Sequence, residues 1–239
     1  MSEFDKFVDR YEDILSDAVK QSGYASSFFV EGKIRELHRF LKSLGRDADA
    51  LNILDFGCGI GKAEPIIRSY FKNAFIYAVD VSEDSIAAAR TRNKDMDRCV
   101  YATFDGHRLP FEHSFDLVYI AGTLHHIPRE QHVPLLYMLG ASLRERGMIF
   151  IFEHNPYNPL TVKAVRSCEL DEHAVLLKPG YLDRVLNESG FTWRKLRFIL
   201  FFPSFLRLLL PLERYLGWLP LGAQYYYIAS KQRKRSGLK

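Results

Sequence analysis

The sequence LNILDFGCGIGK, residues 51–62, joins a short apolar run to three closely spaced glycines. We interpret residues 52–56 as a buried strand, residues 57–61 as a glycine turn and residues 62–71 as a helix. Glycine allows the backbone to approach a ligand closely, and the N-terminus of the following helix offers unpaired N–H groups. The stretch therefore predicts a strand–turn–helix unit with a ligand site at the turn.

The same alternation of strand and helix continues toward the C-terminus. We expect further buried strands at residues 75–80, 99–102, 115–121 and 148–152, with helices between them. Five such units predict an α/β fold with a doubly wound, mostly parallel sheet. Two later strand-like runs, 191–202 and 223–230, fit a hairpin added at one sheet edge, which gives seven strands in all.

Two helical segments lie outside this alternation. Apolar residues at helical spacing predict one helix over residues 2–20 and a second over residues 30–44. Because both precede the first strand, we expect residues 1–48 to form an N-terminal helical cap on a ligand-binding domain at 49–239. The apolar run at 203–221 predicts a helical insertion, or lid, between the last two strands.

Composition and charge exclude several classes of protein. Of the 239 residues, 47% are hydrophobic and 26% are charged, which is the balance of a globular domain and not of a disordered chain. The net charge is +4, but residues 231–239 hold five cations and no acid, so the remainder carries −1. We interpret this tail as a solvated terminus, and a body without a basic stripe argues against nucleic-acid binding.

The cysteines and the apolar runs bear on the compartment. Cys58, Cys99 and Cys168 are far apart, so they suggest neither a zinc site nor a disulfide framework. The first 15 residues are too acidic for a signal peptide, and no apolar run reaches the length of a membrane-spanning helix. We therefore expect a protein of the reducing cytoplasm.

An acidic residue after the second strand adds to the glycine turn. Asp80 ends the strand at 75–80, where a carboxylate can accept hydrogen bonds from both hydroxyls of a ribose. A structural alternative is that Asp80 caps the next helix, but Ser82 already serves as the N-cap. A dinucleotide site has the pattern G-x-G-x-x-G, whereas here the third glycine comes one residue early and Lys62 takes its place. The two features together predict a nucleoside ligand.

Three blocks of sequence carry a resemblance to a known family. LDFGCGIGK, AVDVS and DGHRLPFEHSFDLVYIAGTLHHI occur in the order and spacing of the class I methyltransferases that depend on S-adenosylmethionine (SAM), and the likeness covers roughly residues 51–152. The likeness is greatest to the branch that acts on small molecules and includes quinone methyltransferases. It implies a Rossmann-like fold and SAM as the cofactor.

The resemblance also implies which residues bind the cofactor. The glycine turn would lie under the methionine part of SAM, Asp80 would hold the ribose, and Asp105 would meet the adenine amino group. An N-terminal tyrosine closes over the cofactor in this family; Tyr11 is our candidate and Tyr24 the alternative. The full set is Tyr11, Asp55, Gly57, Cys58, Gly59, Gly61, Asp80, Val81, Asp105, Gly106, His107, Ala121 and Gly122.

Histidines follow the fourth and fifth strands and are our candidates for catalysis. His125, His126 and His154 fall at the carboxyl edge of the sheet, where open α/β folds bind ligands. An alcohol acceptor must lose a proton, and an imidazole is suited to take it. The alternative is that they are loop histidines with no chemical role. Together with Glu153 they could hold a metal, but no ligand spacing supports one, so we expect no metal.

The acceptor is the least determined part of the function. The segments FEHNPYNPLT (152–161) and LPLGAQYY (219–226) resemble bacterial enzymes of saccharide and secondary-metabolite biosynthesis. We therefore expect a hydroxyl of a sugar, glycoconjugate or natural product, and a role in polysaccharide biosynthesis. The apolar insertion could roof the acceptor pocket, which we favour, or contact a membrane, which would suit a lipid-linked or quinone-like acceptor.

Two other functions remain as rivals. A protein of the same fold could bind SAM without catalysing a reaction, although the intact glycine turn and Asp80 argue against such degeneration. An oxidoreductase that uses a nicotinamide cofactor is disfavoured by the missing third glycine and by the LHH block. The sequence does not predict the oligomeric state.

Overall fold

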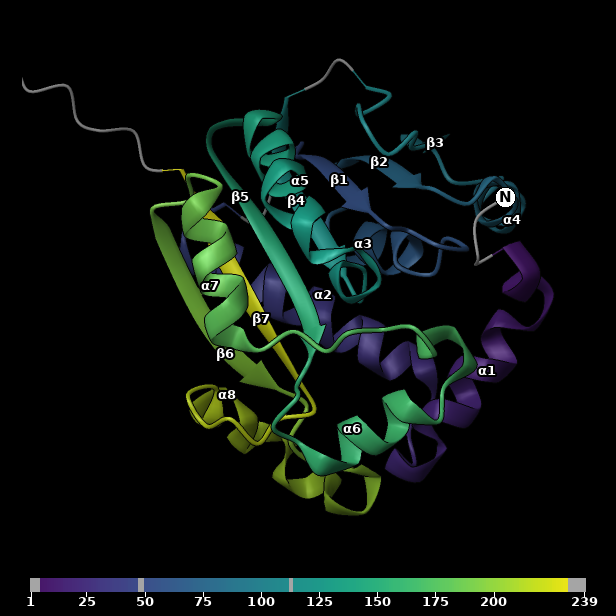
Figure 1. Cartoon of the computed structure of the whole chain (residues 1–239), viewed down its shortest axis with the longest axis vertical. Coiled ribbons are helices and arrows are strands. Elements are labelled where there is room, and N and C mark those ends of the chain that lie inside the picture. Colours follow the sequence, from purple (N-terminus) through teal and green to yellow (C-terminus); the bar gives the residue numbers. More distant parts are fainter. Residues whose placement is uncertain (1–4, 47–49, 112–113, 232–239) are drawn as a thin grey trace, which may run out of the picture.

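The computed structural model describes residues 5–46, 50–111 and 114–231. Four features of the sequence interpretation lie wholly or partly outside these ranges: the first four residues, the domain boundary at 48–49, the Glu112–His113 pair and most of the basic tail. The chain forms one seven-stranded sheet with helices on both faces (Figure 1). This confirms the α/β, doubly wound and Rossmann-like fold expected from the strand–helix alternation.

The sheet has the strand order β3-β2-β1-β4-β5-β7-β6. Its strands are β1 (Asn52–Phe56), β2 (Phe75–Asp80), β3 (Cys99–Thr103), β4 (Phe115–Ala121), β5 (Leu143–His154), β6 (Trp193–Ile199) and β7 (Gln224–Ser230). The first five pair in parallel, and β7 lies antiparallel to both β5 and β6. The order of the strands reverses between β1 and β4, and open α/β sheets bind ligands at the carboxyl ends beside such a point.

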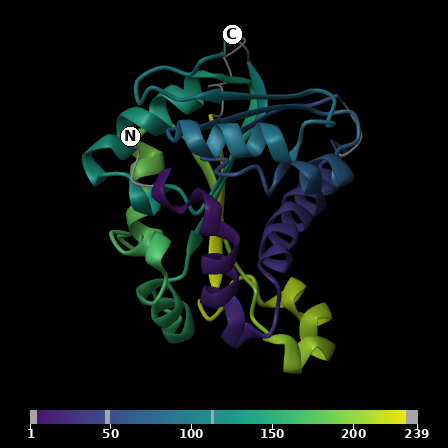
Figure 2. The ribbon, with the colours of Figure 1, turned by 90° about the vertical axis from the view of Figure 1, so that its right-hand side faces the viewer.

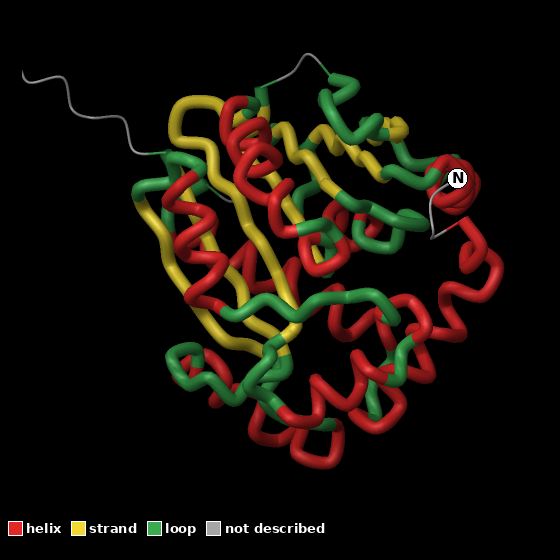
Figure 3. The backbone as a smooth tube through the Cα atoms, viewed as in Figure 1, coloured by secondary structure: helices red, strands yellow, loops and turns green. Residues whose placement is uncertain are grey.

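Helices account for most of the remaining chain (Figure 3). The α-helices are α1 (Tyr11–Val19), α2 (Ser26–Ser43), α3 (Glu64–Tyr70), α4 (Glu83–Arg92), α5 (Arg129–Ala141), α6 (Pro159–Arg166), α7 (Pro179–Glu188) and α8 (Glu213–Leu216). The 3-10 helices are η1 (Asp5–Arg10), η2 (Lys20–Ser22), η3 (Leu124–His126), η4 (Glu169–Asp171) and η5 (Ser204–Leu212).

Alternate strand residues enter two separate cores because successive side chains of a strand point to opposite faces. On one face α5 and α7 cover the sheet, and Leu54 of β1 belongs to this core with Leu136 and Leu186. On the other face α2 and α3 cover it, and Ile53 lies in a cluster with Leu37 and other apolar residues of these helices. Helix α2 therefore belongs to the helical layer that covers this face of the sheet. Of the cap expected over residues 1–48, the described part before residue 25 lies outside that layer.

The N-terminal residues, α6 and the insertion gather at one end of the sheet (Figures 1 and 2). Strand β5 runs toward this end, so these segments cover the carboxyl edge that carries the glycine turn. The side chain of Asp5 accepts a hydrogen bond of 2.6 Å from Ser82 Oγ, which fixes η1 against the start of α4. The pair Arg10–Glu169, at 3.1 Å, joins η1 to η4.

Three boundaries differ from the sequence interpretation. The strand expected at 148–152 begins instead at Leu143, because residues before Arg146, at φ +64°, pair with β4 across a register shift. Helix α6 was not expected; Asn158 starts it by accepting hydrogen bonds from the N–H groups of Leu160 and Thr161. The insertion is a kinked 3-10 helix followed by one short turn of α-helix. Over the described ranges, no helix is both long and apolar enough to cross a membrane.

Candidate cofactor and acceptor site

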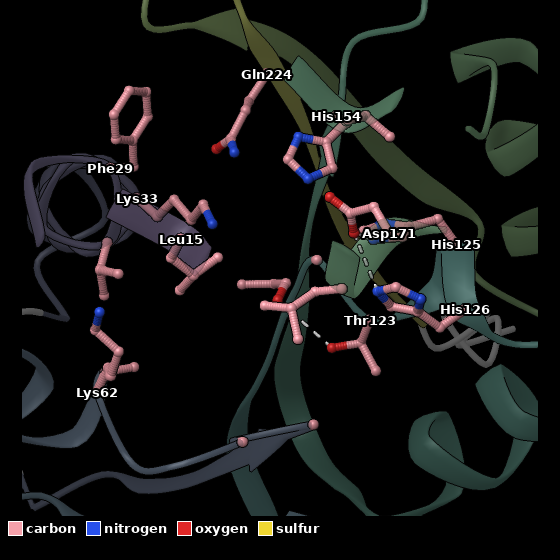
Figure 4. Close-up of a pocket in the computed structure, with 18 of the residues that line it drawn as sticks. Leu15, Phe29, Lys33, Lys62, Thr123, His125, His126, His154, Asp171 and Gln224 are labelled. Carbon is pink, nitrogen blue, oxygen red and sulfur yellow. Dashed lines mark hydrogen bonds and ion pairs between the residues drawn. The ribbon is translucent and has the colours of Figure 1, made fainter. Parts of the chain in front are cut away.

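A cavity of about 1070 Å³ lies at the carboxyl edge beside the β1–β4 reversal (Figure 4). Its wall combines the glycine turn and the ends of β2, β4 and β5 with residues of α1, α2, α6 and the insertion. Pockets for single small ligands hold about 300–1000 Å³. The cavity therefore has room for a nucleoside cofactor and a second molecule.

The glycines of the turn have different roles in the structure. Gly57 and Gly59 line the cavity with φ of +79° and +53°, a backbone conformation that side chains rarely adopt. A Cβ on Gly57 would lie 2.4 Å from Thr123 Oγ1. Gly61 does not line the cavity: a Cβ there would lie 2.9 Å from Ala89 Cβ, so this glycine permits close packing against α4.

Asp80 is fixed against the glycine turn. One of its carboxylate oxygens accepts the N–H of Gly59 at 2.8 Å, and the other accepts the N–H of Ser82 at 3.0 Å. Burial raises the pKa of Asp80, and the two backbone hydrogen bonds oppose this rise. Ser82 caps α4 by accepting the N–H of Ser85 at 3.0 Å, so the helix does not need Asp80 as a cap. Each carboxylate oxygen keeps a second lone pair, which can accept a ribose hydroxyl.

A buried carboxyl group lies beneath the turn. Asp55 is 2% exposed and lines the cavity, and its Oδ2 has no hydrogen-bond partner within the described ranges. Burial, followed by the charges of Glu64 and Asp80, raises the pKa of Asp55 well above its usual range. An unsatisfied buried oxygen is costly, so Asp55 is ready to accept a hydrogen bond from a cationic ligand. The amino group of the methionine part of SAM fits this requirement.

Only some of the predicted cofactor residues in the loop after β3 line the cavity. Gly106 and His107 line the cavity, whereas Asp105 is fully exposed and does not. One Asp105 oxygen accepts the N–H groups of His107 and Arg108, both at 2.7 Å, and these bonds lower the pKa of Asp105. The side chain therefore builds the turn that presents its neighbours, and its contact with adenine stays a prediction.

The remaining predicted cofactor residues border the cavity: Tyr11, Cys58, Val81, Ala121 and Gly122. The Tyr11 hydroxyl lies 3.4 Å from the position that a Gly59 Cβ would take, so α1 reaches over the glycine turn. Burial, followed by the charge of Asp80, raises the pKa of Tyr11. Tyr24 also lines the cavity, but its ring stacks on Phe28 at 3.7 Å and so belongs to the apolar wall.

The predicted catalytic histidines meet two carboxylates at the opposite wall (Figure 4). His125 Nδ1 is 2.5 Å from Glu153 Oε2, and Glu153 Oε1 accepts the N–H of Leu124 at 3.1 Å. His125 Nε2 and His126 Nε2 each lie 3.4 Å from Asp171 Oδ1. The ring of His154 has its centre 5.1 Å from that of His125. The structure thus brings all three histidines to one wall of the cavity.

The surrounding charges shift the pKa values of His125 and His154 in opposite directions. Burial lowers the pKa of His125, but Glu153 and Asp171 outweigh it and raise the pKa to about 9. Burial, followed by the positive charge of His125, lowers the pKa of His154 to about 4. At neutral pH, His125 is therefore held as a cation between two carboxylates, while His154 is neutral and can accept a proton.

The sequence interpretation did not identify two charged residues of the site. Asp171 comes from η4, in a segment whose pattern gives no regular element. Lys33 of α2 points into the cavity (Figure 4), and burial lowers its pKa to about 8 although Glu153 and Asp55 oppose the shift. A signal for Lys33 was present, because helical spacing places it on the same face as Phe29 and Leu37. A lysine on such an apolar face must reach solvent, a partner or a ligand.

Comparison with known proteins gives a match to part of the chain. Residues 53–147 match the family described as a methyltransferase domain. A 27-O-demethylrifamycin SV methyltransferase from Amycolatopsis mediterranei is 37% identical over 86 residues, which cover 34% of this chain and 31% of that protein. A malonyl-[acyl-carrier protein] O-methyltransferase from Bacillus anthracis is 32% identical over 84 residues, with the same coverage. The matches thus span about a third of the length of these relatives.

Solved structures resemble the whole fold. A SAM-dependent methyltransferase from Archaeoglobus fulgidus superposes with a TM-score of 0.60 at 19% identity, over 83% of this chain and 94% of that one. A magnesium protoporphyrin IX methyltransferase from Synechocystis PCC 6803, with SAH bound, superposes with a TM-score of 0.63 at 16% identity, over 96% of each chain.

The fold is that of the class I methyltransferases, and the cavity lies at the sheet edge where open α/β folds bind ligands. Residues 53–147 match a methyltransferase domain, and the fold is one that solved SAM-dependent methyltransferases share. S-adenosylmethionine is the cofactor that this likeness implies. The glycine turn and the orphaned oxygen of Asp55 fit that cofactor on the geometry alone.

We expect Asp80→Ala to weaken the binding of SAH, the demethylated product, by about a hundredfold. The reason is the loss of two charge-assisted hydrogen bonds to the ribose, each contributing about 1.5 kcal/mol. The fold should survive with a modest drop in melting temperature, because Ser82 still caps α4. Calorimetric titration checks the affinity and thermal unfolding checks the fold.

The matched control is Asp84→Ala, which removes an exposed carboxylate from the first turn of α4. It should bind SAH like the unaltered protein. If Asp80→Ala instead keeps full affinity while its melting temperature collapses, Asp80 is structural and does not bind the cofactor.

Proposed function

We propose that the protein transfers the methyl group of SAM to a hydroxyl of a small or medium-sized metabolite, with a sugar, glycoconjugate or natural product as the first candidate. The observation that carries this proposal is that the histidine–carboxylate cluster and the glycine turn border one cavity. The two curated relatives described above are named as O-methyltransferases or as a demethylrifamycin methyltransferase, which agrees with an oxygen acceptor.

SAM supplies a methyl group already activated on a sulfonium, which an acceptor oxygen takes in line as the carbon–sulfur bond breaks. In this proposal, Asp55 and the glycine turn hold the methionine part, and Asp80 holds the ribose. Tyr11 covers the turn and excludes water. Positioning of this kind can account for about 7–11 kcal/mol of barrier lowering.

The proton of the acceptor hydroxyl goes to a histidine in this proposal. Of the two buried rings, only that of His154 is neutral and so has a lone pair for the proton, although a pKa of about 4 makes it a weak base. His125, fixed by Glu153 and Asp171, donates a hydrogen bond and keeps the wall rigid. Lys33 faces the same space and would attract an acceptor that carries a negative charge.

Substitution of the neutral histidine should lower turnover without affecting the cofactor. We expect His154→Ala to reduce kcat by about a hundredfold or more, which is the usual contribution of general acid–base catalysis. The measurement is SAH release across a panel of hydroxylated saccharides and phenolic natural products, with SAH affinity determined in parallel. His173→Ala is the control, because His173 is an exposed histidine of the same region.

Full activity at neutral pH in His154→Ala and in His125→Ala, singly and together, would show that neither ring takes the proton. An acceptor whose own proton is already acidic would then be the better explanation. Unchanged SAH affinity in the same variants separates this result from loss of the fold.

A second acceptor class is favoured by the exposed side of the insertion. Pro203 and Phe205 of the insertion line the cavity beside Phe201 and Phe202, in keeping with a roof, but other apolar side chains of the insertion are exposed. Leu208 is 87% exposed and Trp218 is 75% exposed. Exposed apolar residues on a segment that borders the cavity suit contact with a lipid surface, and so a lipid-linked or quinone-like acceptor.

Co-sedimentation with phospholipid vesicles tests the lipid-borne alternative. If it holds, the protein should pellet with the vesicles, and the double variant Leu208→Glu, Leu209→Glu should stay in the supernatant. Leu44→Glu, at an exposed apolar position at the end of α2, is the control and should still pellet. Protein that stays in the supernatant without any substitution rules this alternative out and leaves the metabolite hydroxyl.

Three further expectations stay proposals. We propose a cytoplasmic location, supported by three cysteines that are all free thiols. A role in polysaccharide biosynthesis rests on the sequence resemblance at residues 152–161 and 219–226. A SAM-binding protein without catalysis is the remaining rival, and the turnover assay above decides against it if any acceptor is methylated.

A further inference from the structure

Three potential metal ligands converge at the cavity wall from three separate elements. His125 lies in η3, His154 ends β5 and Asp171 ends η4. One nitrogen of each histidine and one oxygen of Asp171 all lie within 4.8 Å of one another. Figure 4 shows these side chains grouped at one wall of the cavity. Because the three residues are far apart in the chain, no ligand spacing in the sequence reveals the group.

The orientation of His125 is an independent sign of a ligand at this place. Its Nδ1 is bonded to Glu153, so the lone pair or proton of Nε2 is directed away from that carboxylate. The side chain is 1% exposed, and Nε2 faces Asp171 Oδ1 at 3.4 Å, an ion-pair contact that is longer than an ordinary hydrogen bond. An ion held between Nε2 and Asp171 would lie closer to each atom than the two atoms now lie to each other.

The surroundings of His125 match those of metal-bound histidines. Such histidines almost always donate their second ring nitrogen to a carboxylate or carbonyl, which fixes the tautomer and the ring orientation. Glu153 fills this role, and the N–H of Leu124 holds its other oxygen at 3.1 Å. His126 contacts Asp171 as well, so it restrains the third ligand from outside the group.

The donor set indicates the class of ion. Two imidazole nitrogens with one carboxylate oxygen form open sites for zinc and for other divalent first-row transition metals. Ligand atoms about 2.1 Å from one ion lie at most about 4.2 Å apart. Small side-chain rotations would therefore bring the three donors into range. With three protein ligands, at least one position remains for a molecule in the cavity.

We propose that His125, His154 and Asp171 bind one divalent transition-metal ion, with zinc as the preferred metal. This inference deepens the proposed function, on which its catalytic part rests: the open position takes the hydroxyl oxygen of the acceptor. Coordination makes that hydroxyl acidic, and its proton leaves to solvent before the oxygen takes the methyl group. Binding of the ion displaces the Nε2 proton of His125 to solvent. In the metal-bound protein, the two histidines are then ligands, and neither serves as the proton acceptor.

Metal binding can be measured without any turnover. The full-length chain is stripped with a chelator, incubated with Zn²⁺ or Co²⁺, desalted, and assayed for metal by elemental analysis. We expect one ion per chain. Bound Co²⁺ should give a visible absorption spectrum typical of a low coordination number and an asymmetric arrangement of ligands. Asp171→Asn and His154→Asn should lose this binding.

Two variants sharpen the test. Glu153→Gln should weaken metal binding by about 10- to 100-fold, as is usual when the residue that orients a ligand is changed. His173→Asn, at an exposed histidine, should bind like the unaltered protein. Thermal unfolding and SAH affinity of each variant show that the fold and the cofactor site persist.

The proposal is overturned if the unaltered protein retains no stoichiometric Zn²⁺ or Co²⁺ after desalting, and this result does not depend on any variant folding. It is also overturned if folded Asp171→Asn and His154→Asn proteins bind the ion as before. Turnover that persists in the chelated protein would leave the proposed function standing without the metal. Stoichiometric metal with no methyl transfer to any acceptor would leave the metal site standing without the proposed function.

Discussion

The hydrogen bond from the Gly59 N–H to the Asp80 carboxylate, 2.8 Å long, joins the two halves of the cofactor site. It ties the turn after β1 to the end of β2, and the N–H groups of Gly57 and Cys58 support it by donating to the carbonyl of Val79 at 2.8 and 3.0 Å. These bonds require the positive φ angles of Gly57 and Gly59. The turn stays open for a cofactor because it has no side chains at these two positions.

Everything else in the site is arranged around this turn by the order of the strands. Because β4 pairs with β1 on the side away from β2, the residues after β4 and β5 face the turn across the cavity. The predicted cofactor residues and the histidine wall thereby border one cavity. The buried charges of His125, Glu153 and Asp171 compensate one another, so the wall can hold ionised groups away from water.

The sequence predicted the parts of this protein that depend on local pattern. The glycine turn, Asp80 and the buried strands follow from apolar periodicity and from the geometry of glycine, and each lies where expected. The boundary of β5 was missed because a bend at Arg146 and Gly147 depends on pairing with β4. Asp171 was missed for a related reason: its partners lie in η3, and only the tertiary fold brings η4 to them. Gly61 was assigned to the cofactor, yet it is needed for packing against Ala89.

The central claim is that the cavity beside the glycine turn binds SAM. Isothermal titration of the full-length chain with SAM, SAH and NAD tests it most directly, because the three ligands share an adenosine and differ beyond it. The account predicts one site per chain for SAM and SAH, with a Kd of about 1 μM, equivalent to about −8.2 kcal/mol, and no measurable binding of NAD. Tight binding of NAD without binding of SAM or SAH would contradict it.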